Sequence, residues 1–304
     1  MNKDFKDVKE FANEIKARLE DMFPGAEFNV AEVTKNNDEI MIGLSVKNSV
    51  NDYTPQVYLN DFYEKFKAGK KTIEEIALIV QQVFDSQNEE PWTVINVNNL
   101  REWETLKSKL IIKLVGLENN KEYLKNAVYK RVCDNLAAVV FILFDIKEDG
   151  LITSKLTKEQ FETLDISMSE VIETAIANTE KILPVKIKKM SELLSEQMGC
   201  DIFELPPEED IMYVMSNSIM VNGAATLIYP NVLRDFCVEH GLERVIILPS
   251  SIHETILVFP NTMMEDDELK CLVTEVNGEV VKNQDVLSND VYVYTVEDDE
   301  IHVL

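Results

Sequence analysis

Apolar residues recur at three- and four-residue steps over several stretches of the chain, the spacing of one buried face of a helix. The clearest stretches are residues 4–23, which end at a Pro-Gly pair, and residues 73–84. Thr72 and Glu75 stand just before the second stretch with the spacing of a capping box, in which each residue satisfies a backbone N–H of the other. Further helices are predicted at residues 168–182, 229–241 and 265–276.

Runs of β-branched and aromatic residues lie between these helices and predict strands. The most apolar run is LAAVVFILFDI at residues 136–146. Residues 245–248 and 255–259 flank a turn and predict a hairpin, and residues 291–304 predict a closing hairpin. Helices interleaved with hairpins favour an α+β fold, with mixed, mostly antiparallel sheets, amphipathic helices packed on them, and two lobes.

The length of 304 residues also favours two domains, since a single domain usually has about 100 to 200 residues. The run ELPPEED at residues 204–210 combines two prolines with four acids and is the best linker candidate. We therefore expect an N-terminal α+β region at residues 1–205, with a softer internal boundary near 86–99, and an acidic C-terminal α+β region at residues 206–304.

The net charge of −25 is concentrated in the last third of the chain. Residues 201–304 hold 21 acidic and only 4 basic residues, whereas residues 1–200 hold 34 acidic and 26 basic residues. Such an anionic surface repels nucleic acid and attracts a basic protein, which is the expected charged partner. Solubility alone is the simpler explanation of the same charge.

Several kinds of chemistry are disfavoured by composition. The four cysteines lie far apart and there are only three histidines, so no zinc or iron site is expected, although carboxylates alone would suit Mg²⁺ or Ca²⁺. Glycines are too widely spaced for a phosphate-binding loop, and no cofactor is expected. The charged N-terminus and the lack of a long apolar run predict a cytoplasmic protein without a membrane segment.

The turn at residues 249–254 holds the one cluster that combines hydroxyls, a base and an acid, namely Ser250, Ser251, His253 and Glu254. Adjacent strand residues point to opposite faces, so His253 and Glu254 are not expected to serve one catalytic site. The main interpretation is a structural turn, with ligand binding and catalysis as alternatives. We accordingly expect a His253→Ala variant to keep its fold.

A second polar turn contains Asn217 and Asn222, between two predicted strands. Its backbone groups would be able to hold a ligand, which makes Asn217 and Asn222 binding candidates. A plain hairpin loop is the simpler interpretation.

Several phrases in the chain carry a family resemblance. They are PQVYLNDFYEKFKAG at 55–69, NGAATLIYPNVLRDF at 222–236, VIILPSSIHETIL at 245–257 and VLSNDVYVY at 286–294. With these phrases the chain resembles an uncharacterised family of clostridial and other gut-Firmicute proteins, often carried on mobile elements. The last third is also similar to the YtpQ-like proteins. The resemblance implies no activity and no catalytic residues.

Three functions remain as hypotheses. The first is a non-enzymatic accessory or interaction protein of the cytoplasm, which binds a partner through its acidic surface. The second is an anti-defence or DNA-mimic inhibitor of a nucleic-acid-binding enzyme. The third is a small-molecule enzyme or ligand-binding protein that uses the loop at residues 249–254.

Overall fold

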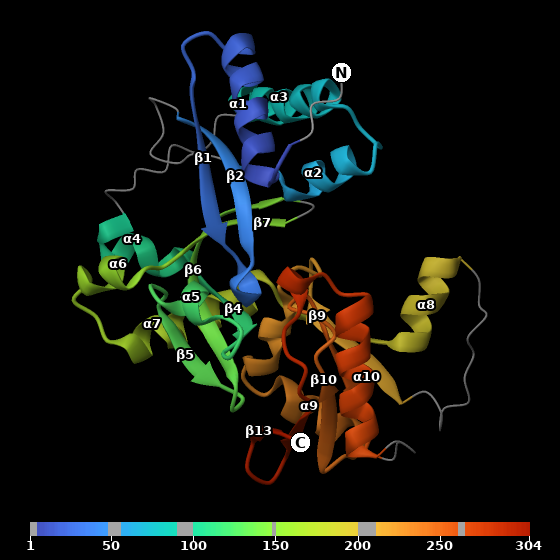
Figure 1. Cartoon of the computed structure of the whole chain (residues 1–304). Coiled ribbons are helices and arrows are strands. Elements are labelled where there is room, and N and C mark those ends of the chain that lie inside the picture. The colour runs from blue at the N-terminus through green and yellow to red at the C-terminus, as the bar shows by residue number, and fades with distance from the viewer. Residues whose placement is uncertain (1–4, 48–55, 90–99, 148–149, 200–210, 261–264) are drawn as a thin grey trace. The chain divides into compact units, whose positions relative to one another are not determined.

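The computed structural model describes residues 5–47, 56–89, 100–147, 150–199, 211–260 and 265–304 (Figure 1). Helices and antiparallel sheets alternate in them, which confirms the α+β class. The chain divides into two units: unit 1 comprises Met1–Lys35 and Glu39–Leu100, and unit 2 comprises Asn36–Asp38 and Arg101–Leu304. This division lies next to the predicted internal boundary near 86–99. The predicted linker at 204–210 lies outside the described residues.

The described part of unit 1 packs helices on an antiparallel sheet of order β1-β2-β3. Its elements are α1 (Val8–Met22), β1 (Glu27–Thr34), β2 (Ile40–Lys47), β3 (Gln56–Tyr58), α2 (Asn60–Lys67) and α3 (Ile73–Glu89). Phe11 of α1, Leu44 of β2 and Val80 of α3 are among the buried residues of one core. The predicted capping box is confirmed, because Thr72 and Glu75 each accept the backbone N–H of the other, at 3.2 and 2.7 Å.

The described part of unit 2 contains two antiparallel sheets, one of order β4-β6-β5 with β7 also paired to β6, and one of order β13-β12-β10-β11-β9-β8. Its elements up to the second sheet are α4 (Trp103–Leu106), η3 (Lys107–Lys109), β4 (Leu110–Gly116), α5 (Lys121–Leu124), β5 (Tyr129–Val132), β6 (Leu136–Lys147), β7 (Gly150–Lys155), α6 (Lys158–Glu162) and α7 (Met168–Ile182). The remaining elements are β8 (Val185–Lys189), α8 (Met190–Met198), β9 (Met212–Asn217), η4 (Gly223–Ile228), α9 (Val232–His240), β10 (Arg244–Leu248), β11 (Thr255–Val258), α10 (Asp266–Glu279), η5 (Asn283–Asp285), β12 (Tyr292–Thr295) and β13 (Glu300–Val303).

The strands on either side of residue 205 belong to the same sheet. β8 pairs with β9 from Val185 opposite Asn217 to Lys189 opposite Tyr213. The division that the linker composition suggests at residue 205 therefore runs between two hydrogen-bonded strands of unit 2. A local composition rich in proline does not show whether the strands before and after it pair with each other, as β8 and β9 do.

The two helices α9 and α10 cover opposite faces of the six-stranded sheet. Alternate residues of a strand point to opposite faces. Val245 and Ile247 of β10 lie in a core with Phe236 of α9, whereas Ile246 and Leu248 lie in a second core with Leu269 and Val273 of α10. Figure 1 shows α10 alongside β10. The sheet is thus buried on both faces, which explains the continuous apolar run of β10.

The long strand β6 is covered on both faces, which explains why its run of apolar residues is unbroken. Leu136 and Ala138 face the same core as α9, and Val139 and Phe141 face a separate core on the other side of the four-stranded sheet. Thr179 of α7 is buried beside this sheet, and its hydroxyl accepts the Ile112 N–H of β4 at 2.9 Å. Both faces of β6 are therefore covered.

The segment Asn36–Asp38 belongs to unit 2 through a buried network of amides. Asn120 is completely buried, and its side chain donates to Asn36 Oδ1 at 3.0 Å while its own oxygen accepts the Asn37 N–H at 2.8 Å. The Asp38 carboxylate accepts the N–H groups of Glu122 and Tyr123 in the first turn of α5. Every bond in this network matters, because an unpaired buried amide costs about 1–3 kcal/mol.

We predict that Leu248→Asp destabilises unit 2 by several kcal/mol, since it places an unpaired charge in the core under α10. Leu248 is 5% exposed. Val238→Asp is the control, because Val238 of α9 is 68% exposed and the same charge there stays in water. Chemical unfolding of both variants measures the difference. Equal midpoints would show that α10 does not pack on the sheet as described.

Candidate functional site

The structure brings the six predicted site residues to one end of the six-stranded sheet. Strands β9 and β11 are antiparallel neighbours, with Met215 opposite Thr255. The end of β9, which carries Asn217, therefore lies beside the start of β11, which follows the turn Ser250–Glu254. Asn222 is adjacent because its backbone N–H donates to His253 Nδ1 at 3.2 Å. We call these residues the loop cluster.

His253 holds the loop cluster together through both its ring and its backbone. Its carbonyl accepts the Ser216 hydroxyl at 2.7 Å and the Gly223 N–H at 3.0 Å. The ring nitrogen Nε2 lies 3.5 Å from the Asp285 carboxylate. Because Nδ1 accepts a hydrogen bond from Asn222, the proton of the neutral ring lies on Nε2, facing Asp285. The oriented partners of the His253 ring, Asn222 and Asp285, therefore come from other loops and not from the neighbouring Glu254.

The loop cluster does not form a nucleophile relay. The Ser251 hydroxyl accepts the backbone N–H of His253 at 3.0 Å, and the Ser250 hydroxyl donates to Glu254 at 3.2 Å. Neither serine is hydrogen-bonded to the His253 ring, which a Ser-His-acid arrangement requires. Asn217 is completely buried, and its side-chain oxygen accepts the N–H groups of Ile219 and Val221. These contacts give the cluster a structural role.

The polar turn after β9 also differs from the predicted plain hairpin. Gly223–Ile228 is a 3₁₀ helix, η4, where a second strand was expected. The reason lies at Gly223, where an added Cβ would stand 2.0 Å from Ser216 Oγ and 2.5 Å from the His253 carbonyl oxygen. The chain can approach this closely only without a side chain. The segment that begins at Gly223 therefore packs closely on β9 and does not form a strand paired with it.

A separate pocket of about 510 Å³ opens elsewhere in unit 2. Three segments line it: residues 130–134, which are the end of β5 and the turn that follows, residues 227–231 with Leu233 and Arg234 at the start of α9, and Tyr294 with residues 299–302 of the last hairpin. We call this space the turn pocket. None of its lining residues belongs to the predicted set, because three turns far apart in sequence build it.

The walls of the turn pocket contain residues in the left-handed backbone region. Cys133, Asp134, Asn231 and Asp299 have φ values of 47°, 60°, 64° and 59°. Asn and Asp tolerate this conformation, whereas for other L-residues it costs about 1–2 kcal/mol. The Asp and Asn residues are a sequence signal for each turn taken singly. No local pattern in the sequence indicates that the three turns meet.

Charged groups in the turn pocket are coupled through hydrogen bonds. The Asp299 carboxylate accepts the Tyr294 hydroxyl at 2.6 Å and lies 3.2 Å from the Arg234 guanidinium. The Tyr294 bond and then Arg234 lower the pKa of Asp299. Burial, followed by the bond to Asp299, raises the pKa of Tyr294 to about 12. Burial likewise raises the pKa of Cys133 to about 12, so this thiol stays protonated and is not a nucleophile at neutral pH.

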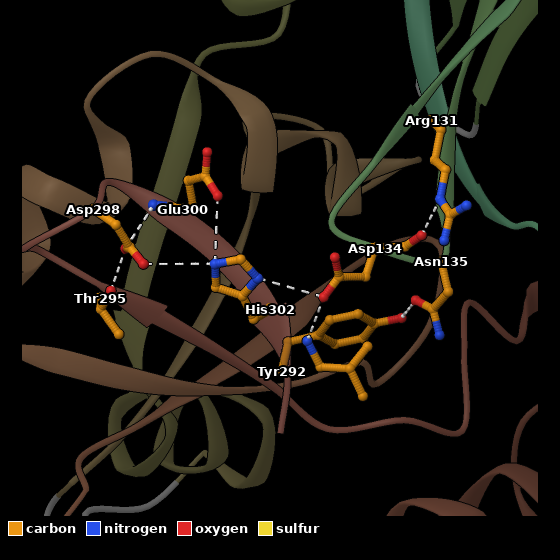
Figure 2. Close-up of polar contacts among 9 residues, drawn as sticks. Arg131, Asp134, Asn135, Tyr292, Thr295, Asp298, Glu300 and His302 are labelled. Carbon is orange, nitrogen blue, oxygen red and sulfur yellow. Dashed lines mark hydrogen bonds and ion pairs between the residues drawn. The ribbon is translucent and has the colours of Figure 1, made fainter.

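His302 lies in the pocket wall with carboxylates on both sides of its ring (Figure 2). Nδ1 is 3.5 Å from Asp134, and Nε2 is 3.5 Å from Asp298 and 3.4 Å from Glu300. Asp134 also accepts the Val303 N–H at 3.1 Å. Two of the three carboxylates thus face Nε2 and the third faces Nδ1. Among the described residues, no group of three or more His, Cys, Asp or Glu side chains is arranged to hold a metal ion.

Comparison with known proteins gives a family and no activity. A family model described as a family of unknown function, DUF5688, matches residues 8–296. The chain belongs to this family. No curated protein and no solved structure matches it. Within the described residues, no helix is both long and apolar enough to cross a membrane.

We predict that Gly223→Ala destabilises the protein by about 1–3 kcal/mol, because the new methyl group collides with Ser216 and His253. Gly278→Ala is the matched control, since Gly278 lies in α10 with no atom within 4 Å of the added Cβ. There alanine should be neutral or stabilise by up to about 1 kcal/mol. Thermal unfolding compares them. Equal melting temperatures would contradict the close approach at Gly223.

His253→Ala should keep its fold, as the sequence predicts, but should cost about 0.5–2 kcal/mol, because it leaves the Asn222 N–H without its acceptor. His253→Asn should lose less, since its amide oxygen can accept the same N–H. The free energy of unfolding measured by denaturant titration separates the variants. A His253→Ala protein as stable as the natural one would show that the ring does not hold the loops.

Proposed function

We propose that this protein is a non-enzymatic interaction protein that binds a basic, amphipathic segment of a partner through α10. The observation that supports the proposal is a row of solvent-exposed apolar side chains beside a row of acids on this helix. The loop cluster is occupied by its own hydrogen bonds and does not offer a catalytic arrangement. This leaves binding as the better-supported class of function.

The apolar row consists of Leu272 and Val276 of α10, which are 40% and 39% exposed, and of Val280, the C-cap residue just after the helix, which is 76% exposed. Residues four apart lie one above the other on a helix face, so Leu272 and Val276 form a stripe that Val280 follows at the end of the helix. The stripe runs beside the core-facing residues Leu269 and Val273. It therefore continues the apolar surface of the sheet core outward into solvent. An exposed apolar row of this kind marks a contact surface more often than isolated apolar residues do.

Acids border the other side of the stripe. Glu268, Glu275 and Glu279 are exposed and lie three or four residues from Leu272 or Val276, on the neighbouring face of the helix. Lys270, the one basic residue of α10, is paired with Asp290 at 2.9 Å. A complementary partner must offer apolar side chains flanked by lysine or arginine. A basic amphipathic helix has this pattern and binds grooves and faces of this type.

The setting we propose for this interaction is the cytoplasm, where the free thiols of Cys133, Cys237 and Cys271 remain reduced. An origin in clostridia and other gut Firmicutes, carriage on mobile elements and a relation of the last third to YtpQ-like proteins are further parts of the proposal. They rest on the quoted sequence phrases alone.

We predict that two changes to α10 each weaken the complex with a partner captured from the native host by about tenfold or more, as is usual for central interface residues. Leu272→Ser with Val276→Ser removes the apolar row, and Glu268→Gln with Glu275→Gln and Glu279→Gln removes the acidic row. The control removes three exposed acids elsewhere: Glu159→Gln, Glu162→Gln and Glu170→Gln. It should bind as the natural protein does.

Affinity should also fall between 0.1 M and 1 M salt, because the screening length shortens from about 10 Å to about 3 Å. A partner that both α10 variants retain, or whose affinity is independent of salt, would contradict the proposal. Release of the partner by duplex DNA would instead support an inhibitor that mimics DNA.

A further inference from the structure

The turn pocket lies between the edges of the two sheets of unit 2. Within the described residues, β5 is an edge strand of the four-stranded sheet and β13 is an edge strand of the six-stranded sheet. Residues 130–132 of β5 and 300–302 of β13 all line the pocket. Successive residues of a strand point to opposite faces, so a cavity on one face would contact only alternate residues. A cavity that contacts consecutive residues of both strands faces their edges, where backbone groups are exposed.

On β5, the backbone groups of Arg131 point away from the sheet. Residues of an antiparallel strand alternate between those that exchange hydrogen bonds with the neighbouring strand and those whose N–H and C=O point outward. The Val140 N–H donates to the Val128 carbonyl at 2.9 Å, and β5 and β6 keep one register from there to the end of the strand. Lys130 is therefore bonded to β6, whereas Arg131 presents its N–H and C=O to the pocket.

On β13, the same alternation selects Ile301. The Leu304 N–H donates to the Val291 carbonyl at 2.8 Å, which makes the even-numbered residues of β13 the ones bonded to β12. The Val303 N–H supports this assignment, because it donates to the Asp134 carboxylate and not to β12. Ile301 therefore also presents its N–H and C=O to the pocket.

The pocket thus has exposed backbone groups on two sides, one set from each sheet. No other described residue is hydrogen-bonded to the outward groups of Arg131 or Ile301. Unpaired groups on an edge strand are a template for pairing with another strand. Asp134 closes one end of the gap, since it contacts both Val303 and the His302 ring (Figure 2).

The volume of the pocket fits a short extended peptide. A residue of a strand occupies roughly 3.3 Å along the strand, 4.8 Å across the sheet and 10 Å between packed faces. The pocket volume of about 510 Å³ therefore has room for about three such residues.

The lining of the pocket favours an uncharged ligand with an apolar side chain. It contains three basic and three acidic residues besides His302, so its fixed charges balance. Leu227 of η4 and Leu233 of α9 add apolar surface between the two edges. A peptide backbone is neutral, and it carries a donor and an acceptor at each residue other than proline.

We propose that the turn pocket binds an extended peptide segment of another protein, which adds a strand between β5 and β13. Alternate residues of the peptide hydrogen-bond to Arg131 on one side and to Ile301 on the other. Apolar side chains at alternate positions pack on Leu227 and Leu233. In strand addition, backbone hydrogen bonds supply affinity and the contacts of alternate side chains supply specificity. This site does not depend on the proposed partner of α10.

The test uses the full chain and three capped, uncharged peptides. The first is acetyl-Thr-Val-Thr-Val-Thr-amide, which has apolar side chains at alternate positions. The second carries an N-methyl group on its central amide, which removes one donor and blocks one edge. The third has serine in place of both valines. Ligand-observed nuclear magnetic resonance titration should show that the first peptide binds in the micromolar to low millimolar range, and each of the others about tenfold more weakly.

Proline variants locate the hydrogen bonds on the protein. Proline lacks the N–H and is tolerated on an edge strand where that N–H points outward. Arg131→Pro and Ile301→Pro should each weaken the first peptide about tenfold. Arg131→Ala and Ile301→Ala keep the backbone N–H and should bind more tightly than the proline variant at the same position. Thermal unfolding shows which variants remain folded.

Val185→Pro is the matched control on the opposite edge of the six-stranded sheet. Because the Ser218 N–H donates to the Pro184 carbonyl, the next residue of β8, Val185, has an outward N–H. Val185 lies outside the pocket, so this variant should bind the first peptide as the natural protein does.

Hydrogen exchange tests the same bonds without any variant. In the natural protein, the first peptide should slow exchange of the Arg131 and Ile301 amides, because both become hydrogen-bonded. The proposal is overturned if the first peptide does not bind, if its N-methylated form binds as tightly, or if exchange at both amides is unchanged. Folded proline variants that bind as tightly as their alanine counterparts would also overturn it.

Discussion

Unit 2 depends on the docking of one turn, residues 133–135, onto the last hairpin. The Asn135 side chain accepts the Tyr292 hydroxyl at 2.6 Å and donates to Asp290 at 2.5 Å. Beneath it, Leu136 and Ala138 of the four-stranded sheet share a core with Tyr292 of the six-stranded sheet. The apolar core draws the two sheets together without specifying an orientation. The polar contacts of the turn supply that orientation, because a buried hydroxyl or amide must find its partner.

The same docking separates two surfaces with different properties. The turn pocket forms where residues 130–134 meet the start of α9 and the last hairpin, on the side of the sheet that α9 covers. The apolar and acidic rows belong to α10, which covers the opposite face. Strand alternation is the cause, because successive residues of β10 serve the two cores in turn. The turn pocket and the proposed partner-binding surface of α10 therefore lie on different faces of one sheet.

Local signals predicted the elements well, and contacts distant in sequence account for what was missed. Thr72 with Glu75, and Gly241 after α9, mark helix ends through hydrogen bonds within one turn. The prediction of a strand after Asn222 was wrong because Gly223 is held against β9 by contacts from another loop. The partners of His253 and the three turns of the pocket likewise come from segments that no local pattern connects. Sequence alone therefore singled out the residues of the loop cluster in two separate turns, but it predicted neither that these turns meet nor the pocket.

The most direct test of this account is a double-mutant cycle between Asn135 and Tyr292. Asn135→Ala, Tyr292→Phe and the double variant are compared by the free energy of unfolding in denaturant. If the part-buried hydrogen bond between the two side chains holds the turn on the hairpin, the single losses should not add, and the coupling should be about 1 kcal/mol or more. Additive losses within about 0.3 kcal/mol would contradict the account, because they would show that the turn and the hairpin stabilise unit 2 independently.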